Sequence, residues 1–169
     1  MKLLVVIDVQ NDFITGALRN EEAIKRVPNI VEEIRNTDAE VIIATQDTHF
    51  SNYLETQEGK RLPVPHCIKG TPGWKIEQSV QDALDERGAL RPIEKISFGY
   101  PYWNKGMNYD EIELIGYCTD ICVISNAMIL KAICPETRIT VKESCCAGVT
   151  PESHKNALEA MKMCHIDVI

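Results

Sequence analysis

The sequence predicts an α/β fold in three layers, with a parallel sheet covered by helices on both faces. Two observations carry this prediction. Short apolar runs alternate with segments of helical spacing along the whole chain, which is the pattern of successive βαβ units. The first apolar run, residues 3–7, has no polar side chain on either face, as in a strand that is buried on both sides. Because the chain has 169 residues, we expect residues 1–169 to form a single domain.

The individual elements follow from apolar runs, helical periodicity and breakers. The predicted strands are apolar and short, and they lie at residues 3–7, 41–45, 92–96, 111–116, 138–141 and 166–169. The predicted helices lie at residues 21–35, 74–87, 119 or 120 to 133, and 151–163. Pro28 predicts a kink or a late start in the first helix, Gly88 ends the second, and Thr119 or Asp120 is expected to cap the third.

Two long segments between these elements are not periodic. Residues 47–73 are mostly polar, and residues 98–108 are rich in Gly, Pro and Tyr. Loops of such length are uncommon in compact domains and usually have a function.

Composition excludes several classes of function. The net charge is −7, from 25 acidic and 18 basic residues, and this disfavours binding to nucleic acid. No apolar run approaches the roughly 20 residues of a membrane span, and no signal peptide is recognisable, so we expect a cytoplasmic protein without a membrane partner. Seven cysteines, an odd number, indicate free thiols in a reducing compartment.

Polar side chains follow four of the predicted strands. Asp8, Asp47, Lys95 and Thr119 lie at or just beyond strand ends. The carboxyl ends of parallel strands meet at one edge of the sheet, where ligands bind in open α/β folds. The sequence therefore predicts an active site at this edge.

Cys122 is the candidate nucleophile because it lies in the first turn of a predicted helix, directly after a strand. The helix dipole at this place lowers the pKa of a thiol, and free backbone N–H groups can bind an oxyanion. Asp8 could act as a general base and Lys95 could stabilise the thiolate. For each residue a structural interpretation stays open: a buried cysteine, a turn aspartate and a solvated lysine.

A metal site is predicted in the first long loop. Asp47 and His49 are separated by one residue, and His66 lies in the same segment, with Glu55 and Glu58 between them. Oxygen and imidazole ligands of this kind suit zinc, iron or manganese. A cluster of surface side chains is the alternative.

Several short motifs, taken in order, resemble those of the isochorismatase-like cysteine hydrolases, and within them the nicotinamidases and pyrazinamidases. The matching segments are residues 6–13, 45–49, 65–67, 70–73, 95 and 119–123. The resemblance covers almost the whole chain. It implies a six-stranded parallel sheet flanked by helices and cleavage of a small-molecule amide through a cysteine thioester.

The resemblance also implies roles for individual residues. Asp8, Lys95 and Cys122 would form a catalytic triad. A non-proline cis peptide would join Tyr117 to Cys118, so that the backbone amides of Cys118 and Cys122 form the oxyanion hole.

The family pattern implies a divalent metal, with zinc first and iron or manganese as alternatives. Its ligands would be Asp47, His49, His66 and a glutamate in place of a missing histidine. Glu58 fits that place best and Glu55 second. The metal would bind the ring nitrogen of nicotinamide, so the retained ligands favour a nicotinamidase.

The sequence does not determine which side chain forms the wall of the substrate pocket. The family often has an aromatic residue at the place of residues 62–64, which are not aromatic here. Phe13, Phe98, Tyr100 and Trp74 are the candidates to replace it. Trp74 could equally pack in the core or an interface.

Three other functions stay open at this point. One is an amidase of the same fold acting on carbamoyl or ureido groups, and another is a vinyl-ether hydrolase, against which the complete triad argues. The third is a redox-sensing, non-catalytic protein using Cys118, Cys122 or the pair Cys145 and Cys146. The resemblance also implies a homo-oligomer, a dimer or a tetramer. His154 and His165 are expected at the surface or in packing contacts.

Overall fold

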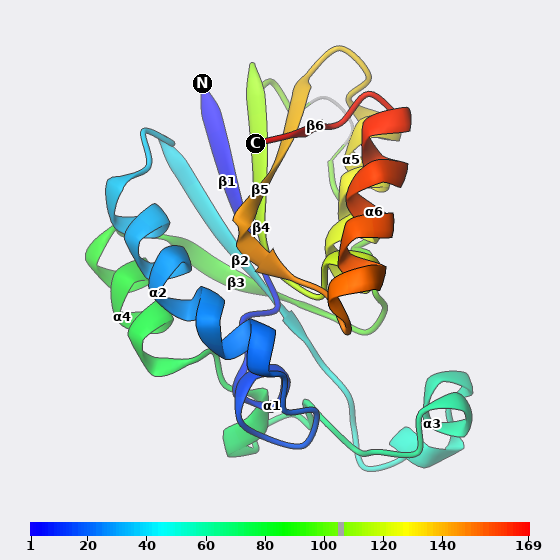
Figure 1. The fold of residues 1–169 in the computed structure, drawn as a ribbon. Coiled ribbons are helices and arrows are strands. Elements are labelled where there is room, and N and C mark those ends of the chain that lie inside the picture. The colour runs from blue at the N-terminus through cyan, green and yellow to red at the C-terminus, as the bar shows by residue number, and fades with distance from the viewer. Residues whose placement is uncertain (105–106) are drawn as a thin grey trace.

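The computed structural model describes residues 1–104 and 107–169, and they form the three-layer α/β/α fold predicted above (Figure 1). The described strands form a six-stranded, all-parallel sheet in the order β3-β2-β1-β4-β5-β6. Helices α2 and α4 cover one face of the sheet, and α5 and α6 cover the other (Figure 1). None of the helices within the described ranges has the length and apolar character needed to cross a membrane.

The strands lie close to their predicted positions, except that the strand predicted at residues 138–141 extends to Ala147. They are β1 Lys2–Ile7, β2 Val41–Asp47, β3 Leu90–Lys95, β4 Glu111–Tyr117, β5 Arg138–Ala147 and β6 Asp167–Val168. The helices are α1 Asn11–Ile14, α2 Glu21–Asn36, α3 Gln57–Arg61, α4 Gln78–Glu86, α5 Ile124–Ile133 and α6 Pro151–Met163. Of the long loop expected at residues 98–108, positions 105 and 106 lie outside the described residues.

The two cores explain why β1 is apolar on both faces. Leu4 and Val6 pack into the core under α2 and α4, whereas Leu3, Val5 and Ile7 pack into the core under α5 and α6. Strand β1 therefore lies in the centre of the sheet, and its last residue lies at the carboxyl edge of the sheet.

One predicted helix begins later than expected. Residues 74–87 are not a single helix: Pro72–Trp74 form a short 3-10 turn, and α4 begins at Gln78. The Gln10 side chain donates to the Trp74 carbonyl at 2.8 Å and holds this segment extended. Glu77 then caps α4 by accepting from Val80 N at 3.1 Å.

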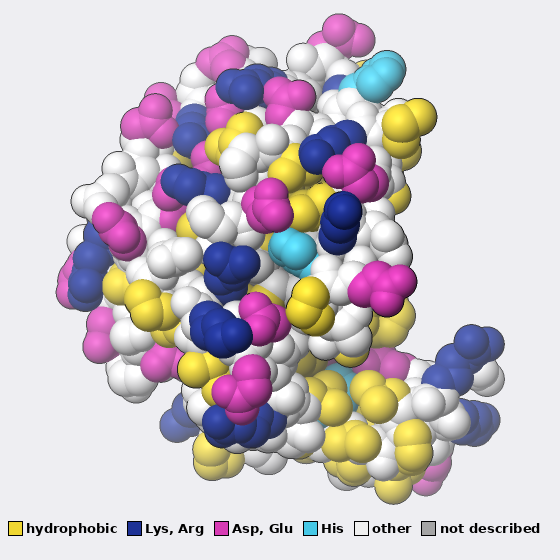
Figure 2. All heavy atoms as spheres, viewed as in Figure 1, with side chains coloured by type: hydrophobic (Ala, Val, Ile, Leu, Met, Phe, Trp, Pro, Cys, Tyr) yellow, Lys and Arg dark blue, Asp and Glu magenta, His cyan; other side chains and the backbone are white. Residues whose placement is uncertain are grey.

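The first long loop contains more regular structure than its sequence pattern predicts. A 3-10 turn at Tyr53–Glu55 and helix α3 interrupt it. Thr56 makes this possible because its hydroxyl accepts from Gly59 N and caps α3. The segment with α3 extends away from the three layers (Figure 1), and apolar side chains gather on it (Figure 2). Phe50, Leu54 and Leu62 are among the exposed apolar residues there.

Strands β1 and β4 approach each other closely at the carboxyl edge of the sheet. Gly116 has a φ of +119°, and a Cβ atom at this position would lie 2.1 Å from the Ile7 carbonyl oxygen. Only glycine combines that dihedral angle with that distance. The close approach brings the end of β1 next to the turn that follows β4.

Candidate active site

A cavity of about 1330 Å³ opens at the carboxyl edge of the sheet. Its walls come from segments that are far apart in the sequence: residues 13–22 after β1, the long segment after β2, the loop after β3, the turn after β4 and Val149 after β5. Its polar lining includes Asp47, His49, Glu58, His66, Cys118 and Cys122. The edge predicted from the strand ends is therefore hollowed, and most of the candidate residues face the hollow.

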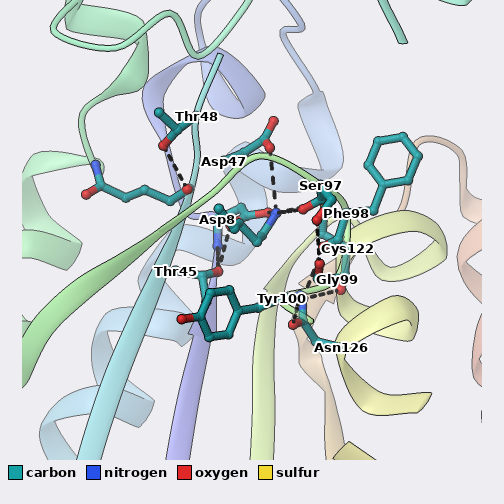
Figure 3. A network of polar contacts seen from close by, with 12 residues as sticks. Asp8, Thr45, Asp47, Thr48, Ser97, Phe98, Gly99, Tyr100, Cys122 and Asn126 are labelled. Carbon is teal, nitrogen blue, oxygen red and sulfur yellow. Dashed lines mark hydrogen bonds and ion pairs between the residues drawn. The ribbon is translucent and has the colours of Figure 1, made fainter. Parts of the chain in front are cut away.

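A buried polar network lies next to this cavity, and Asp8, Asp47 and Cys122 belong to it (Figure 3). Lys95 is at its centre. Its Nζ lies 2.6 Å from Asp8 Oδ2 and donates to Cys122 Sγ at 3.6 Å. It also donates to the Ser97 carbonyl at 3.1 Å and lies 3.7 Å from Asp47 Oδ1. The structure therefore brings the three predicted triad residues together around one ammonium group.

Asp8 is held on its other side by Thr45, whose hydroxyl donates to Asp8 Oδ1 at 2.6 Å. The Asp8 side chain is fully buried. Burial raises the pKa of its carboxyl group above the ordinary range, although the charge of Lys95 acts in the opposite direction. A raised pKa makes this carboxylate a stronger base than a solvated aspartate.

Burial alone would lower the pKa of Lys95, which is 2% exposed. The nearby Asp8, Cys122 and Asp47 outweigh burial, so the pKa of Lys95 is raised and its ammonium stays charged.

The environment of Cys122 corrects the expectation of a lowered thiol pKa. Cys122 is only 4% exposed. Burial, followed by the charge of Asp8, raises the pKa of its thiol well above the ordinary value, although Lys95 acts against this. A raised thiol pKa means that the use of Cys122 as a nucleophile requires a base to remove its proton.

The turn that carries Cys122 differs from the predicted capped helix start. Thr119–Val123 form a π-helical turn, and α5 begins only at Ile124. Neither Thr119 nor Asp120 caps it. Thr119 Oγ1 lies 2.7 Å from His154 Nδ1 on α6, and the Asp120 carboxylate accepts from Val149 N.

The peptide bond between Tyr117 and Cys118 is cis. The Cys118 carbonyl accepts from Ile121 N and Val123 N at 3.0 Å each, so this residue is the point where β4 passes into the nucleophile turn.

Four side chains in the cavity present potential metal ligands. Among the described residues, the ligand atoms of Asp47, His49, Glu58 and His66 all lie within 4.8 Å of one another. Asp47 Oδ2 lies 3.0 Å from His49 Nε2 and 3.7 Å from His66 Nε2, and Glu58 Oε1 lies 3.5 Å from each of these nitrogens. Glu58 belongs to this group and Glu55 does not.

The chemistry of this donor set fits a divalent ion. Two imidazole nitrogens and two carboxylates converge, as in zinc and related sites. His66 Nδ1 lies 2.8 Å from the Val64 carbonyl, the outer contact that fixes a ligating imidazole with Nε2 toward the metal.

The carboxylates and imidazoles of the donor set shift one another's pKa values, and a metal ion would bind here in place of the imidazole protons. Burial raises the pKa of Glu58, but both histidines outweigh it and the pKa falls to about 2. Burial lowers the pKa of His49, but Asp47 and Glu58 outweigh it and raise the pKa to about 9.

The structure separates the four aromatic candidates for the substrate wall. Phe13 and Phe98 line the cavity. Tyr100 packs edge-on against Trp103, and Trp74 packs against the core under α2 and α4 while its Nε1 donates to Thr48 Oγ1. Leu62 lines the cavity beside the metal ligands, so an aliphatic side chain forms part of the wall.

Sequence reasoning missed several residues that support the site. Gln10 donates to the Asp47 carbonyl and accepts from Asp47 N, which fixes the backbone of a candidate metal ligand. Tyr53 packs edge-on against both His49 and His66. Asn126, four residues after Cys122, is fully buried and bonds to its carbonyl. Gln10 lies next to a strand-end motif, which was a usable signal, whereas Tyr53 and Asn126 had none.

Comparison with known proteins agrees with this geometry. The family model described as the isochorismatase domain matches residues 2–169. The nicotinamidase/pyrazinamidase of Mycobacterium tuberculosis is 28% identical over 187 residues, covering 100% of this chain and 98% of that protein.

Solved structures lead to the same family. A nicotinamidase from Bacillus subtilis has a TM-score of 0.83 and 26% identity, with 99% of this chain and 98% of that chain covered. A pyrazinamidase/nicotinamidase from Streptococcus mutans has a TM-score of 0.85 and 25% identity, with both chains fully covered. The resemblance found in the motifs is confirmed, and the chain belongs to the isochorismatase family.

Proposed function

We propose that this amide hydrolase is a metal-containing nicotinamidase, which converts nicotinamide and water into nicotinate and ammonia. One observation carries the proposal: the donor group of Asp47, His49, Glu58 and His66 lines the same cavity as Cys122. Nicotinamide has a ring nitrogen at one end and an amide carbon at the other. A metal held by the donor group would bind the first, and the Cys122 sulfur would attack the second. The relatives named as nicotinamidases support the same assignment.

The first half of the reaction uses the network around Lys95. The Asp8 carboxylate takes the proton of the Cys122 thiol, and Lys95 stabilises the resulting thiolate through its charge. The sulfur attacks the amide carbon, and the backbone amides of Cys118 and Cys122 hold the oxyanion. Asp8 then returns the proton to the departing nitrogen, which leaves as ammonia, and a thioester remains on Cys122.

The second half releases the acid. Asp8 takes a proton from water, whose oxygen attacks the thioester carbon. The oxyanion forms again at the same amides and collapses, and the sulfur leaves as thiolate and regains the proton from Asp8. The product is the carboxylic acid, which gives its remaining proton to solvent and departs as nicotinate. Asp8 therefore accepts or donates the proton in every transfer described above, which agrees with its burial and raised pKa.

The four donor side chains would hold the metal, and we propose zinc because imidazole and carboxylate ligands suit it. When bound, the metal would supply a Lewis-acid site that orients the ring nitrogen of the substrate. The proposal further includes a cytoplasmic, homo-oligomeric enzyme, as implied by the family resemblance.

An ammonia-release assay over a panel of amides tests the function. We expect turnover of nicotinamide and pyrazinamide, and turnover of benzamide lower by about 10²-fold or more because it lacks the ring nitrogen. Turnover of a carbamoyl or ureido substrate with none of nicotinamide would overturn the proposal in favour of another amidase of this fold.

Glu58→Gln and Glu55→Gln form a matched pair for the metal site. We expect Glu58→Gln to weaken zinc binding by about tenfold to 100-fold, because an anionic ligand is replaced by a neutral one. Glu55→Gln should leave zinc affinity unchanged, because Glu55 lies outside the donor group. Equilibrium dialysis with elemental analysis measures both affinities, and equal affinities in the two variants would contradict the assignment of Glu58.

A further inference from the structure

Asn126 is a buried side chain next to the nucleophile that the reaction above does not use. It lies on α5, is 0% exposed, and makes four hydrogen bonds with its amide group. Oδ1 accepts from Tyr100 N and from Trp103 Nε1, each at 2.9 Å. Nδ2 donates to the Cys122 carbonyl at 2.8 Å and to the Phe98 carbonyl at 3.2 Å. An asparagine amide has two donor hydrogens and two acceptor lone pairs, so every bond that it can make is made.

These four bonds join two parts of the site. One partner, the Cys122 carbonyl, belongs to the turn that carries the sulfur. The other three belong to the loop that follows β3, residues 97–103. Figure 3 shows Asn126 next to Phe98 and Tyr100 of this loop. The same loop carries Phe98, which lines the cavity.

The loop is also tied to the catalytic lysine. Lys95 Nζ donates to the Ser97 carbonyl, and Ser97 Oγ donates to the Gly99 carbonyl. Hydrogen bonds therefore connect Lys95 through the 97–103 loop to Asn126, and Asn126 connects the loop to the Cys122 carbonyl. A change at Asn126 reaches the nucleophile, the lysine and the cavity wall together.

We propose that Asn126 is a positioning residue, which fixes the Phe98 wall and the 97–103 loop relative to the Cys122 sulfur. The consequence for substrate binding depends on the proposed function, whereas the consequence for access to the thiol does not. If Asn126 were only structural, replacing it would lower stability and change nothing else. If it is a positioning residue, replacing it changes substrate binding and access to the Cys122 thiol in every folded molecule.

The chemistry of the side chain selects informative variants. In Asn126→Ser, the hydroxyl can still donate to the carbonyl four residues earlier, that of Cys122, but it is too short to reach the loop. In Trp103→Phe, a single donor to Asn126 Oδ1 is lost and an aromatic ring is kept. Asn29→Ser is the control, because Asn29 Nδ2 donates to the Ser144 carbonyl between α2 and β5 and does not line the cavity.

The experiment measures KM and kcat for nicotinamide, and the rate at which iodoacetamide alkylates Cys122, identified by peptide mass. We expect Asn126→Ser to raise KM by about tenfold and to speed alkylation at least about threefold, because the wall over the sulfur is released. Trp103→Phe should move both quantities in the same direction by about threefold, and Asn29→Ser should change neither. Rates are expressed per folded molecule, determined from the melting curve of each variant.

The two proposals fail in different ways. If nicotinamide is not hydrolysed by the unaltered protein, the proposed function is wrong, and the alkylation rate still decides the role of Asn126. If Asn126→Ser and Trp103→Phe lower the melting temperature while KM and the alkylation rate stay at the unaltered values, Asn126 is only structural and the inference is overturned.

Discussion

Cys122→Ala should abolish ammonia release from nicotinamide, with a loss of at least about 10³-fold in kcat. Without the sulfur no thioester can form, and neither Asp8 nor Lys95 can replace it as the attacking atom. Stability should change by only about 1 kcal/mol, because the substitution removes one buried sulfur atom from a turn that faces a cavity. Ammonia release measures the first effect, and thermal unfolding followed by circular dichroism measures the second.

Cys145→Ala is the matched control for the loss of a buried thiol. Cys145 is 1% exposed and packs in the core under α2 and α4, away from the residues that line the cavity. We expect this variant to keep kcat while losing comparable stability. A Cys122→Ala protein that retained a tenth or so of the original kcat would rule out the nucleophile assignment.

Asp8→Asn should lower kcat by about 10²-fold to 10⁴-fold, because the amide cannot take the thiol proton. It should also destabilise the fold by about 3 kcal/mol or more, since breaking this buried ion pair removes the nearest counter-charge of Lys95. The only other carboxylate near Lys95 Nζ among the described residues is that of Asp47, at 3.7 Å. Steady-state kinetics and denaturant unfolding measure the two effects.

Thr45→Val separates these contributions. It removes one hydrogen bond to Asp8 Oδ1 and leaves the carboxylate and the ion pair with Lys95 in place. We expect a loss of about tenfold in kcat and about 1 kcal/mol in stability. If Asp8→Asn were no more damaging to kcat than Thr45→Val, Asp8 would be a structural partner of Lys95 and not the base.

The fold was predictable because each strand is defined by a pattern of residues within one short segment. Each strand is a short apolar run, and apolar burial on both faces of β1 follows directly from residues 3–7. The positions of Asp8 and Lys95 at strand ends followed from the same runs. The ends of helices were less predictable where a side chain from a distant segment determines them. Gln10 holds the segment before α4 extended, so the helix begins at Gln78 and not at residue 74.

The sequence predicted which side chains the structure brings together at this edge, and it predicted their electrostatics less well. A position near a helix start implied a lowered thiol pKa, whereas burial, which depends on the assembled fold, raises it. The supporting side chains could not be found for a similar reason. Asn126 matters through partners in a loop that lies far from it in the sequence, and no spacing rule connects them.

The order of the strands has a consequence for how activity appears during refolding. Asp8, Asp47 and Lys95 follow β1, β2 and β3, but Cys122 follows β4, which pairs with the opposite side of β1. A partly folded chain with only β1, β2 and β3 paired has Asp8, Asp47 and Lys95 near one another, and it lacks Cys122 at the site. Contacts that join distant parts of a chain form late, because their loop-closure entropy must be overcome first. Regain of amidase activity therefore reports completion of the central sheet, and it cannot precede the pairing of β4 with β1.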